Sequence, residues 1–419
     1  MPARVRFAVT VLVSLTVASA AQAQWAPVPQ VPATTCFSVW AKGDTIAAGA
    51  DTVAFVSTDA GVTWKQTRKV AAGVTSVEAV RVRDGRLYAG TYGQGVFVSD
   101  DLGESWLDYS QGLVGGIANS QLYIADLLIH GDSLYAATAG DGPWVRNLAA
   151  PGAWTHFGDV LEPNQASNMN AIATDGTRLL AAAGANGTVF YRDPGQPDWM
   201  LSWLDNLGIV AGLSALSALW TGEAWLVGAN TGVFRSATGA SPWAYTDVGL
   251  SPLFVAHFAR RDQTVFACFG NGAGSTIEFS TDDGAGWNVL DSQPFVFTYG
   301  LAASGQTLYA ARVDGLWRRS IAAVSTPGIP APARLGLAVA GPQPVGDEVR
   351  LRFSMPEAGR AVLEIFDAAG RRVAERLEEV RPAGPSELAW QARGQAPGVY
   401  FARLSAGRLQ EVARFVRVR

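Results

Sequence analysis

The chain has 419 residues, of which 48% are hydrophobic and only 16% are charged, and it contains 46 glycines and 14 tryptophans. This length is enough for one large core or for two domains. Few charges with abundant glycine and aromatic residues are typical of all-β proteins with tight turns. A net charge of −4 excludes a global basic field, so nucleic acid is not an expected partner. The charge is uneven, because residues 24–326 carry −10 and residues 327–419 carry +4.

Residues 1–23 have the pattern of a secretory signal peptide. Arg4 and Arg6 precede the apolar run "FAVTVLVSLTVASA", and "AQA" at 21–23 is a small-residue cleavage site. The run is short for a membrane span, although an uncleaved anchor is the alternative. We therefore expect an exported protein, secreted or attached to the cell surface, that does not span the membrane after signal cleavage.

A pattern of two β runs around a Gly-rich turn occurs seven times along the chain. The copies occupy residues 44–57, 85–99, 132–146, 177–191, 223–236, 263–280 and 306–320. An apolar run precedes each copy and a Trp-led run follows most of them, so each repeat predicts four strands, A to D, in a meander. Seven such repeats predict an all-β fold in which residues 24–325 form a seven-bladed β-propeller.

An octet with Ser, Asp, Gly and Trp at fixed offsets recurs three times, between strands C and D. It reads "STDAGVTW" at 57–64, "SDDLGESW" at 99–106 and "STDDGAGW" at 280–287. We expect Asp to accept hydrogen bonds from backbone N–H groups two and three residues on, and Gly to adopt a positive φ. The indole is expected to pack between blades. The shared positions are Ser57, Asp59, Gly61, Trp64, Ser99, Asp101, Gly103, Trp106, Ser280, Asp282, Gly284 and Trp287.

These octets resemble the Asp-box, or BNR, repeat of sialidase-like propellers, and the resemblance covers roughly residues 24–322. It implies the fold and a structural role for the octet, since members of the family differ in function. Calcium binding by "STDD" is the alternative. It fails on the number of oxygen ligands, because the other repeats do not keep these acids. We therefore expect no metal and no cofactor.

Two further expectations follow from the repeat. Repeat seven lacks a Trp-led strand, and Trp25 precedes Val39 by nearly the same spacing as Trp64 precedes Val77. Residues 24–30 are therefore expected to supply the outer strand of blade seven and to close the ring. Cys36 and Cys268 lie in blades one and six, too far apart for a disulfide, so both thiols are expected to be free and mostly buried.

The C-terminal part has a different composition. Residues 326–336 are a Pro-, Ala- and Gly-rich linker. Residues 337–419 predict a small β-sandwich of about seven strands. The segments "GPQP", "IFDAAGRRV", "GPSELAW" and "PGVYFARL" resemble the C-terminal Ig-like domains of type IX secretion sorting and flagellar hook assembly. This resemblance implies sorting or surface attachment, with secretion machinery as the partner of the C-terminal domain; a plain spacer is the alternative.

The sequence gives little support for catalysis. The sialidase arginine motif is absent, since residues 24–56 contain no Arg. Arg81, Arg83 and Arg312 are interpreted as strand-end residues with solvated heads. Glu78 and Glu162 are the candidates for a glycosidase carboxylate pair, so a sialidase-like or xyloglucanase-like hydrolase remains the alternative function.

We favour non-catalytic binding or scaffolding of a glycan or protein. The expected binding face carries the B–C turns and D–A loops, whereas the axis is expected to be shallow and lined by small apolar residues. Gly, Asn and Asp are common in any tight turn, but a turn does not need Tyr92. The candidate binding residues in these turns are Tyr92, Gln94, Asp141, Asn186, Asn230, Asn271 and Asp314.

Overall fold

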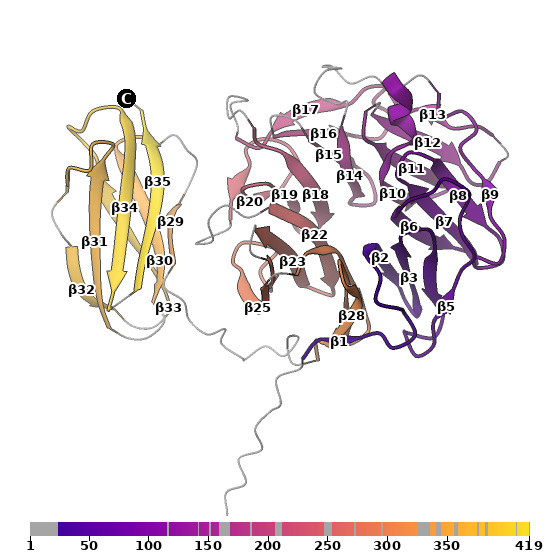
Figure 1. The fold of residues 1–419 in the computed structure, drawn as a ribbon. Helices are drawn as coiled ribbons and strands as arrows, with labels where there is room; N and C mark the ends of the chain where they lie inside the picture. The colour runs from indigo at the N-terminus through magenta and orange to yellow at the C-terminus, as the bar shows by residue number, and fades with distance from the viewer. Residues whose placement is uncertain are drawn as a thin grey trace, which may run out of the picture.

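The structure is a computed structural model in which the chain forms a ring of small sheets followed by a β-sandwich (Figure 1). The described residues are 24–114, 117–140, 142–150, 152–158, 168–184, 187–205, 212–246, 254–271, 274–294, 296–322, 324, 336–340, 345–355, 359–374, 377–381, 384–407 and 409–418. No helix in these ranges is long and apolar enough to cross a membrane.

Seven four-stranded antiparallel sheets, here called blades 1 to 7, follow one another along residues 26–320. Blades 1 and 2 are β2 (Cys36–Lys42), β3 (Thr45–Ala50), β4 (Ala54–Ser57) and β5 (Lys65–Gln66), then β6 (Val77–Arg83), β7 (Arg86–Thr91), β8 (Gly95–Ser99) and β9 (Leu107–Asp108). The 3₁₀ helix η1 (Ile117–Leu122) precedes blade 3, which is β10 (Ile124–His130), β11 (Ser133–Thr138), β12 (Pro143–Asn147) and β13 (Thr155–His156).

Blades 4 to 7 keep the same order of strands. Blades 4 and 5 are β14 (Met169–Thr174), β15 (Leu179–Ala183), β16 (Thr188–Arg192) and β17 (Met200–Trp203), then β18 (Ala215–Trp220), β19 (Trp225–Ala229), β20 (Gly232–Ser236) and β21 (Ala244–Tyr245). Blade 6 is β22 (Phe254–Arg261), β23 (Thr264–Asn271), β24 (Gly274–Ser280) and β25 (Asn288–Pro294). Blade 7 is β26 (Thr298–Ser304), β27 (Thr307–Arg312), β28 (Gly315–Ser320) and β1 (Ala26–Pro27).

The first strand of each blade lies on the inside of the ring. Each of these strands contacts the first strand of the next blade, and β26 contacts β2, so the ring is closed. The apolar clusters lie mainly between successive blades; one joins Tyr88 of blade 2 to Leu134 of blade 3, for example. A sheet of four short strands cannot bury both faces alone, and packing in a ring solves this problem. The fold is a β-propeller.

The N-terminal segment closes the ring. Ala26 and Pro27 pair with Arg318 and Trp317 of β28, and the Val28 N–H donates to the Leu316 carbonyl at 2.9 Å. The pairing places this segment as the outer strand of blade 7, as the spacing of Trp25 predicts. Pro27 fits there because an edge strand can lack an N–H group.

The three octets form the same C–D turn. In the first, the Ser57 hydroxyl accepts the Gly61 N–H at 2.9 Å and donates to the Asp59 carboxylate at 2.8 Å. Asp59 also accepts the Thr63 N–H at 2.9 Å, four residues on. The main backbone donors therefore lie four residues beyond Ser and Asp, not two and three as expected for Asp. The Thr63 hydroxyl also donates to Asp59 at 2.5 Å, and this bond, followed by those from the Thr63 N–H and the Ser57 hydroxyl, lowers the pKa of Asp59 to about 2.

One tryptophan from each blade lies at the junction with the preceding blade. In several cases its indole N–H donates to that blade, which spans the seam with a directed hydrogen bond. The acceptors are the Arg68 carbonyl for Trp106, the Tyr109 carbonyl for Trp154, the Phe157 carbonyl for Trp199 and the Ser202 hydroxyl for Trp243. Trp64 instead meets Tyr309 edge-on at 5.9 Å between ring centroids. These residues fix each blade against its neighbour.

The two cysteines are free and buried. Burial is the main cause that raises the pKa of Cys36 and of Cys268 to about 12 in each case. The prediction of two free, buried thiols is confirmed.

Two sheets form the C-terminal β-sandwich. One is β29 (Gly336–Ala340), β30 (Glu348–Met355) and β33 (Gly384–Gln391); the other is β32 (Leu377–Arg381), β31 (Gly359–Asp367), β34 (Gly398–Ala406) and β35 (Leu409–Arg417). Phe353, Ile365 and Phe415 belong to its core. That apolar cluster contains residues from 337–415 alone among the described residues, so the sandwich has its own core.

Candidate functional site

One face of the propeller carries the B–C turns and the D–A loops, and we call it the loop face. The octet turns and the A–B turns lie on the opposite face, because successive strands of a meander alternate in direction. Each inner strand starts at the loop face and ends at the opposite face. The first residues of the seven inner strands therefore surround the axis at the loop face.

Every inner strand has a register shift at the same place near its start. The shifts lie between Cys36 and Ser38 in β2, Val77 and Ala79 in β6, and at the equivalent point in the other five inner strands. A bulge redirects a side chain and is common beside functional sites. The residues at the seven bulged positions are Phe37, Glu78, Ala125, Asn170, Leu216, Ala256 and Tyr299.

Aromatic side chains gather on the loop face over blades 7, 1 and 2. Tyr299 and Phe37, two bulged residues of neighbouring blades, have ring centroids 5.6 Å apart. Tyr92, in the B–C turn of blade 2, meets Tyr123 edge-on at 4.6 Å. Tyr92 is 57% exposed and Tyr299 is 38% exposed. We call Phe37, Glu78, Tyr92, Tyr123 and Tyr299 the aromatic rim.

Glu78 is the acidic member of the aromatic rim. The Ser76 hydroxyl donates to its carboxylate at 2.5 Å, and the Tyr92 N–H donates to the Ser76 carbonyl at 3.1 Å. Ser76 thus links the acid to the exposed tyrosine. Burial raises the pKa of Glu78, and the Ser76 hydrogen bond offsets part of this effect.

Arg81 and Arg312 do not have the solvated heads that the sequence predicted. Arg81 of blade 2 is 2.6 Å from the Asp126 carboxylate of blade 3, and both side chains are mostly buried. Arg312, only 4% exposed, binds Asp314 through two nitrogens at 2.9 Å and lies over the Trp317 ring. Each guanidinium loses water on burial and gains a carboxylate in exchange, so both are committed to ion pairs. Arg83 is more open, and it pairs with Asp132 and Asp84.

The inner strands also correct the expectation of an axis lined by small apolar residues. Asp126 accepts the Ile172 N–H of blade 4 as well as Arg81 of blade 2, so it connects three inner strands. His257 of blade 6 is affected by the charges of both Asp126 and Arg81, although burial is the main cause that lowers its pKa. The interior of the ring therefore contains a charged cluster.

The predicted turn residues have different environments. Gln94 is exposed beside Tyr92. The Asn230 side chain accepts the Ser214 N–H and donates to the Gly212 carbonyl, so it stabilises a loop. Asp314 forms the ion pair with Arg312. The Asn271 side chain lies outside the described part of the structure, as do Asp141, Asn186 and Glu162.

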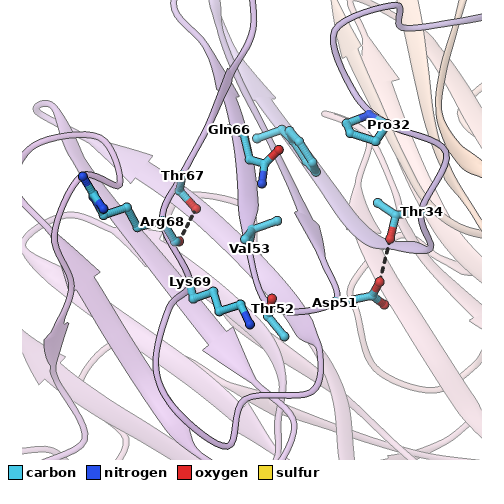
Figure 2. A pocket seen from close by; sticks show the side chains of 10 residues that line it. Pro32, Thr34, Asp51, Thr52, Val53, Gln66, Thr67, Arg68 and Lys69 are labelled. Carbon is cyan, nitrogen blue, oxygen red and sulfur yellow. Dashed lines mark hydrogen bonds between the residues drawn. The ribbon is translucent and has the colours of Figure 1, made fainter.

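A depression of about 650 Å³ lies on blade 1, beside the β3–β4 turn and the end of β5 (Figure 2). Pro32 and Thr34 form one side, and Thr34 donates to Asp51 at 2.6 Å. Phe55 lines it but is 1% exposed, and Arg68 has its Nε 3.6 Å from Glu104 of the next blade. The depression offers no exposed aromatic ring among its lining residues. The aromatic rim is a better candidate binding site than the depression, because it has exposed aromatic side chains.

Tyr92 and Glu78 were predicted from the sequence, whereas Phe37, Tyr123 and Tyr299 were not. Phe37 and Tyr299 occupy the position of Glu78 in their own repeats, so aligning the starts of the inner strands would have found them. Tyr123 lies in the loop before blade 3, which has no counterpart of equal length in most repeats.

The sequence matches no protein-family model, and no curated protein matches it. Solved structures with the same fold include YCF48 from Cyanidioschyzon merolae, with 13% identity, a TM-score of 0.53, and coverage of 71% of this chain and 98% of that one. YCF48 bound to D1 peptide is similar, with 15% identity, a TM-score of 0.54, and coverage of 72% of this chain and 97% of that one.

Two larger proteins also share the fold. The BT4673 extracellular domain from B. thetaiotaomicron has 10% identity and a TM-score of 0.56, and the match covers 95% of this chain and 59% of that one. The GH74 enzyme of Niastella koreensis has 10% identity and a TM-score of 0.54, and the match covers 79% of this chain and 59% of that one. At these identities the likeness establishes the β-propeller fold, and function has to be argued from the site.

Proposed function

We propose that the chain is an exported, surface-associated propeller that binds a glycan without catalysis, through the aromatic rim; a protein ligand at the same face is the second possibility. We also propose that its octets are Asp-boxes, on the strength of their shared Ser, Asp, Gly and Trp positions. The solved propellers of the same fold include both a peptide complex and an enzyme. The fold is therefore compatible with binding and with hydrolysis.

The observation that carries the proposal is that two exposed tyrosines and an acid lie on the loop face: Tyr299 in blade 7, and Tyr92 with Glu78 in blade 2, which Ser76 links. A tyrosine ring has an apolar face and a polar tip, which suits the C–H surface and hydroxyls of a sugar. Tyr92 and Tyr299 are each supported by a second ring, so they present rigid contact area at a low entropy cost. The Ser76-held carboxylate of Glu78 adds a fixed acceptor.

Replacing Tyr92 or Tyr299 with Ala should weaken glycan binding about tenfold, the loss expected for a central aromatic contact. The measurement is a glycan array, followed by titration of the strongest ligand. Tyr245→Ala is the matched control, because Tyr245 is 51% exposed on the outer strand of blade 5. Rim variants that bind like the wild type would contradict the proposal, as would equal losses in all three variants.

Hydrolysis is the alternative to binding, and the observation in its favour is the partly buried Glu78 carboxylate on the loop face, whose pKa burial raises. A glycosidase needs a partner carboxylate, and Glu162, the partner suggested by the sequence, lies outside the described residues. The same glycan panel decides between the two functions. Turnover that Glu78→Gln abolishes would replace the binding proposal with a glycosidase.

We propose that the C-terminal sandwich sorts or attaches the propeller at the cell surface, as its resemblance to sorting domains implies. The separate apolar core supports this division of labour, because a domain with its own core folds without its neighbour. Deleting residues 327–419 should leave the thermal midpoint of the propeller unchanged but release it from its normal location. Calorimetry and cell fractionation test this. Unchanged surface display would favour a spacer, and loss of folding would refute the division.

A further inference from the structure

Ligands that carry a carboxylate are usually held by arginine, whose planar guanidinium matches the two oxygens. Arg81 of β6 in blade 2 and Arg312 of β27 in blade 7 both already form ion pairs. Arg81 is bound to Asp126 at 2.6 Å, and Arg312 is bound to Asp314 through two contacts of 2.9 Å. Extracting Arg81 would leave the mostly buried Asp126 carboxylate without its partner, which is costly, and extracting Arg312 would break a two-nitrogen ion pair with the more exposed Asp314. These arginines are therefore unavailable to an acidic sugar.

Glu78 is in the opposite situation. The Ser76 hydroxyl is its described partner, and no ion pair among the described residues compensates its charge. No described residue donates a hydrogen bond to its second carboxylate oxygen, which is able to accept one from a ligand. The propeller region as a whole carries −10, which adds a weak repulsion toward anions.

Resting on the binding function proposed above, we propose that Glu78 makes the aromatic rim selective for carboxylate-free glycans. A sugar hydroxyl donates to the free oxygen of Glu78 while the sugar ring packs on Tyr92 or Tyr299. A sugar carboxylate in the same place meets a like charge, and the guanidinium groups of Arg81 and Arg312 are already paired with acids. Glu78 thus acts as a specificity-determining residue, accepting neutral sugars and rejecting uronic and sialic acids.

The test compares ligands of the same size that differ in charge. The probes are oligogalacturonates and their methyl esters, together with a glycan array that contains neutral and sialylated members, all at pH 7.5. The wild type should bind the neutral form about tenfold or more tightly than the acid, since one like charge near a partly buried carboxylate is worth at least that ratio. Glu78→Gln should bring the ratio close to one, because the amide can still bond to a hydroxyl but carries no charge.

Glu104→Gln is the matched control. It also removes one negative charge, but Glu104 lies in an octet turn on the opposite face, where it pairs with Lys65. Its neutral-to-acid ratio should equal that of the wild type. A wild type that prefers the acidic probes overturns the selectivity, and so does a ratio that Glu78→Gln does not change. Absence of any glycan binding would instead refute the proposed function on which the selectivity rests.

Discussion

Replacing Trp199 with Ala will lower the free energy of unfolding of the propeller by about 3–5 kcal/mol, the range for deleting a fully buried aromatic side chain. Trp199 is 0% exposed at the junction of blades 4 and 3. Its N–H donates to the Phe157 carbonyl at 2.7 Å, and its ring meets the Phe157 ring edge-on at 6.0 Å. The substitution removes both the apolar contact and the donor, so the Phe157 carbonyl is left without it.

Equilibrium urea unfolding followed by circular dichroism measures this loss. Trp199→Phe keeps an aromatic ring but removes the N–H, so its loss should be smaller. Trp106→Ala provides a second comparison at a junction where the indole is only half-buried and donates to Arg68 at 3.2 Å. If the free energy of unfolding of Trp199→Ala lies within about 0.5 kcal/mol of the wild-type value, as for an ordinary surface substitution, the tryptophans do not hold the blades together.

The fold could be predicted because the repeat constrains each blade separately. The apolar runs, the Gly-rich turns and the octets fix strand order, and the missing Trp-led strand after 320 pointed to Trp25 as its replacement. Hydrogen-bond offsets were harder to predict. The turn has two consecutive residues at positive φ, Ala60 at 58° and Gly61 at 83°, and this curls the backbone so that Ser57 and Asp59 bond four residues on.

The candidate site was predicted less well, for two physical reasons. A bulge changes which residue of a strand faces the axis, and nothing in the sequence "CFSVWAK" predicts a bulge at Phe37. Ion pairs between blades are also invisible in one sequence. Arg81 and Asp126 lie 45 residues apart and meet only because the ring places β6 beside β10. An isolated strand-end arginine is usually solvated, and here the neighbouring blade supplies an acid.

The N-terminal segment that closes the ring, residues 25–28, packs at both junctions of blade 7, so the stability of this blade depends on it. Trp25 packs against the cluster that joins blades 6 and 7, which includes Ile277 and Leu308. Val28 belongs to the cluster that joins blade 7 to blade 1, together with Phe55 and Leu316. Only two residues of this segment form a strand, so its burial has to supply most of the closing free energy.

Val28→Asp should therefore open the ring at blade 7 and lower the thermal midpoint by about 10 °C or more, since an unpaired charge in an apolar junction costs several kcal/mol. Val28 is 0% exposed. Val62→Asp is the matched control, because Val62 is 68% exposed in the first octet and the same change there should shift the midpoint by less than about 2 °C. Hydrogen exchange should locate the weakening in β28, β27 and β26, where loss of the outer strand first exposes backbone N–H groups. Equal midpoints for the two variants would mean that the ring closes without this segment, through the inner contact of β26 with β2 alone.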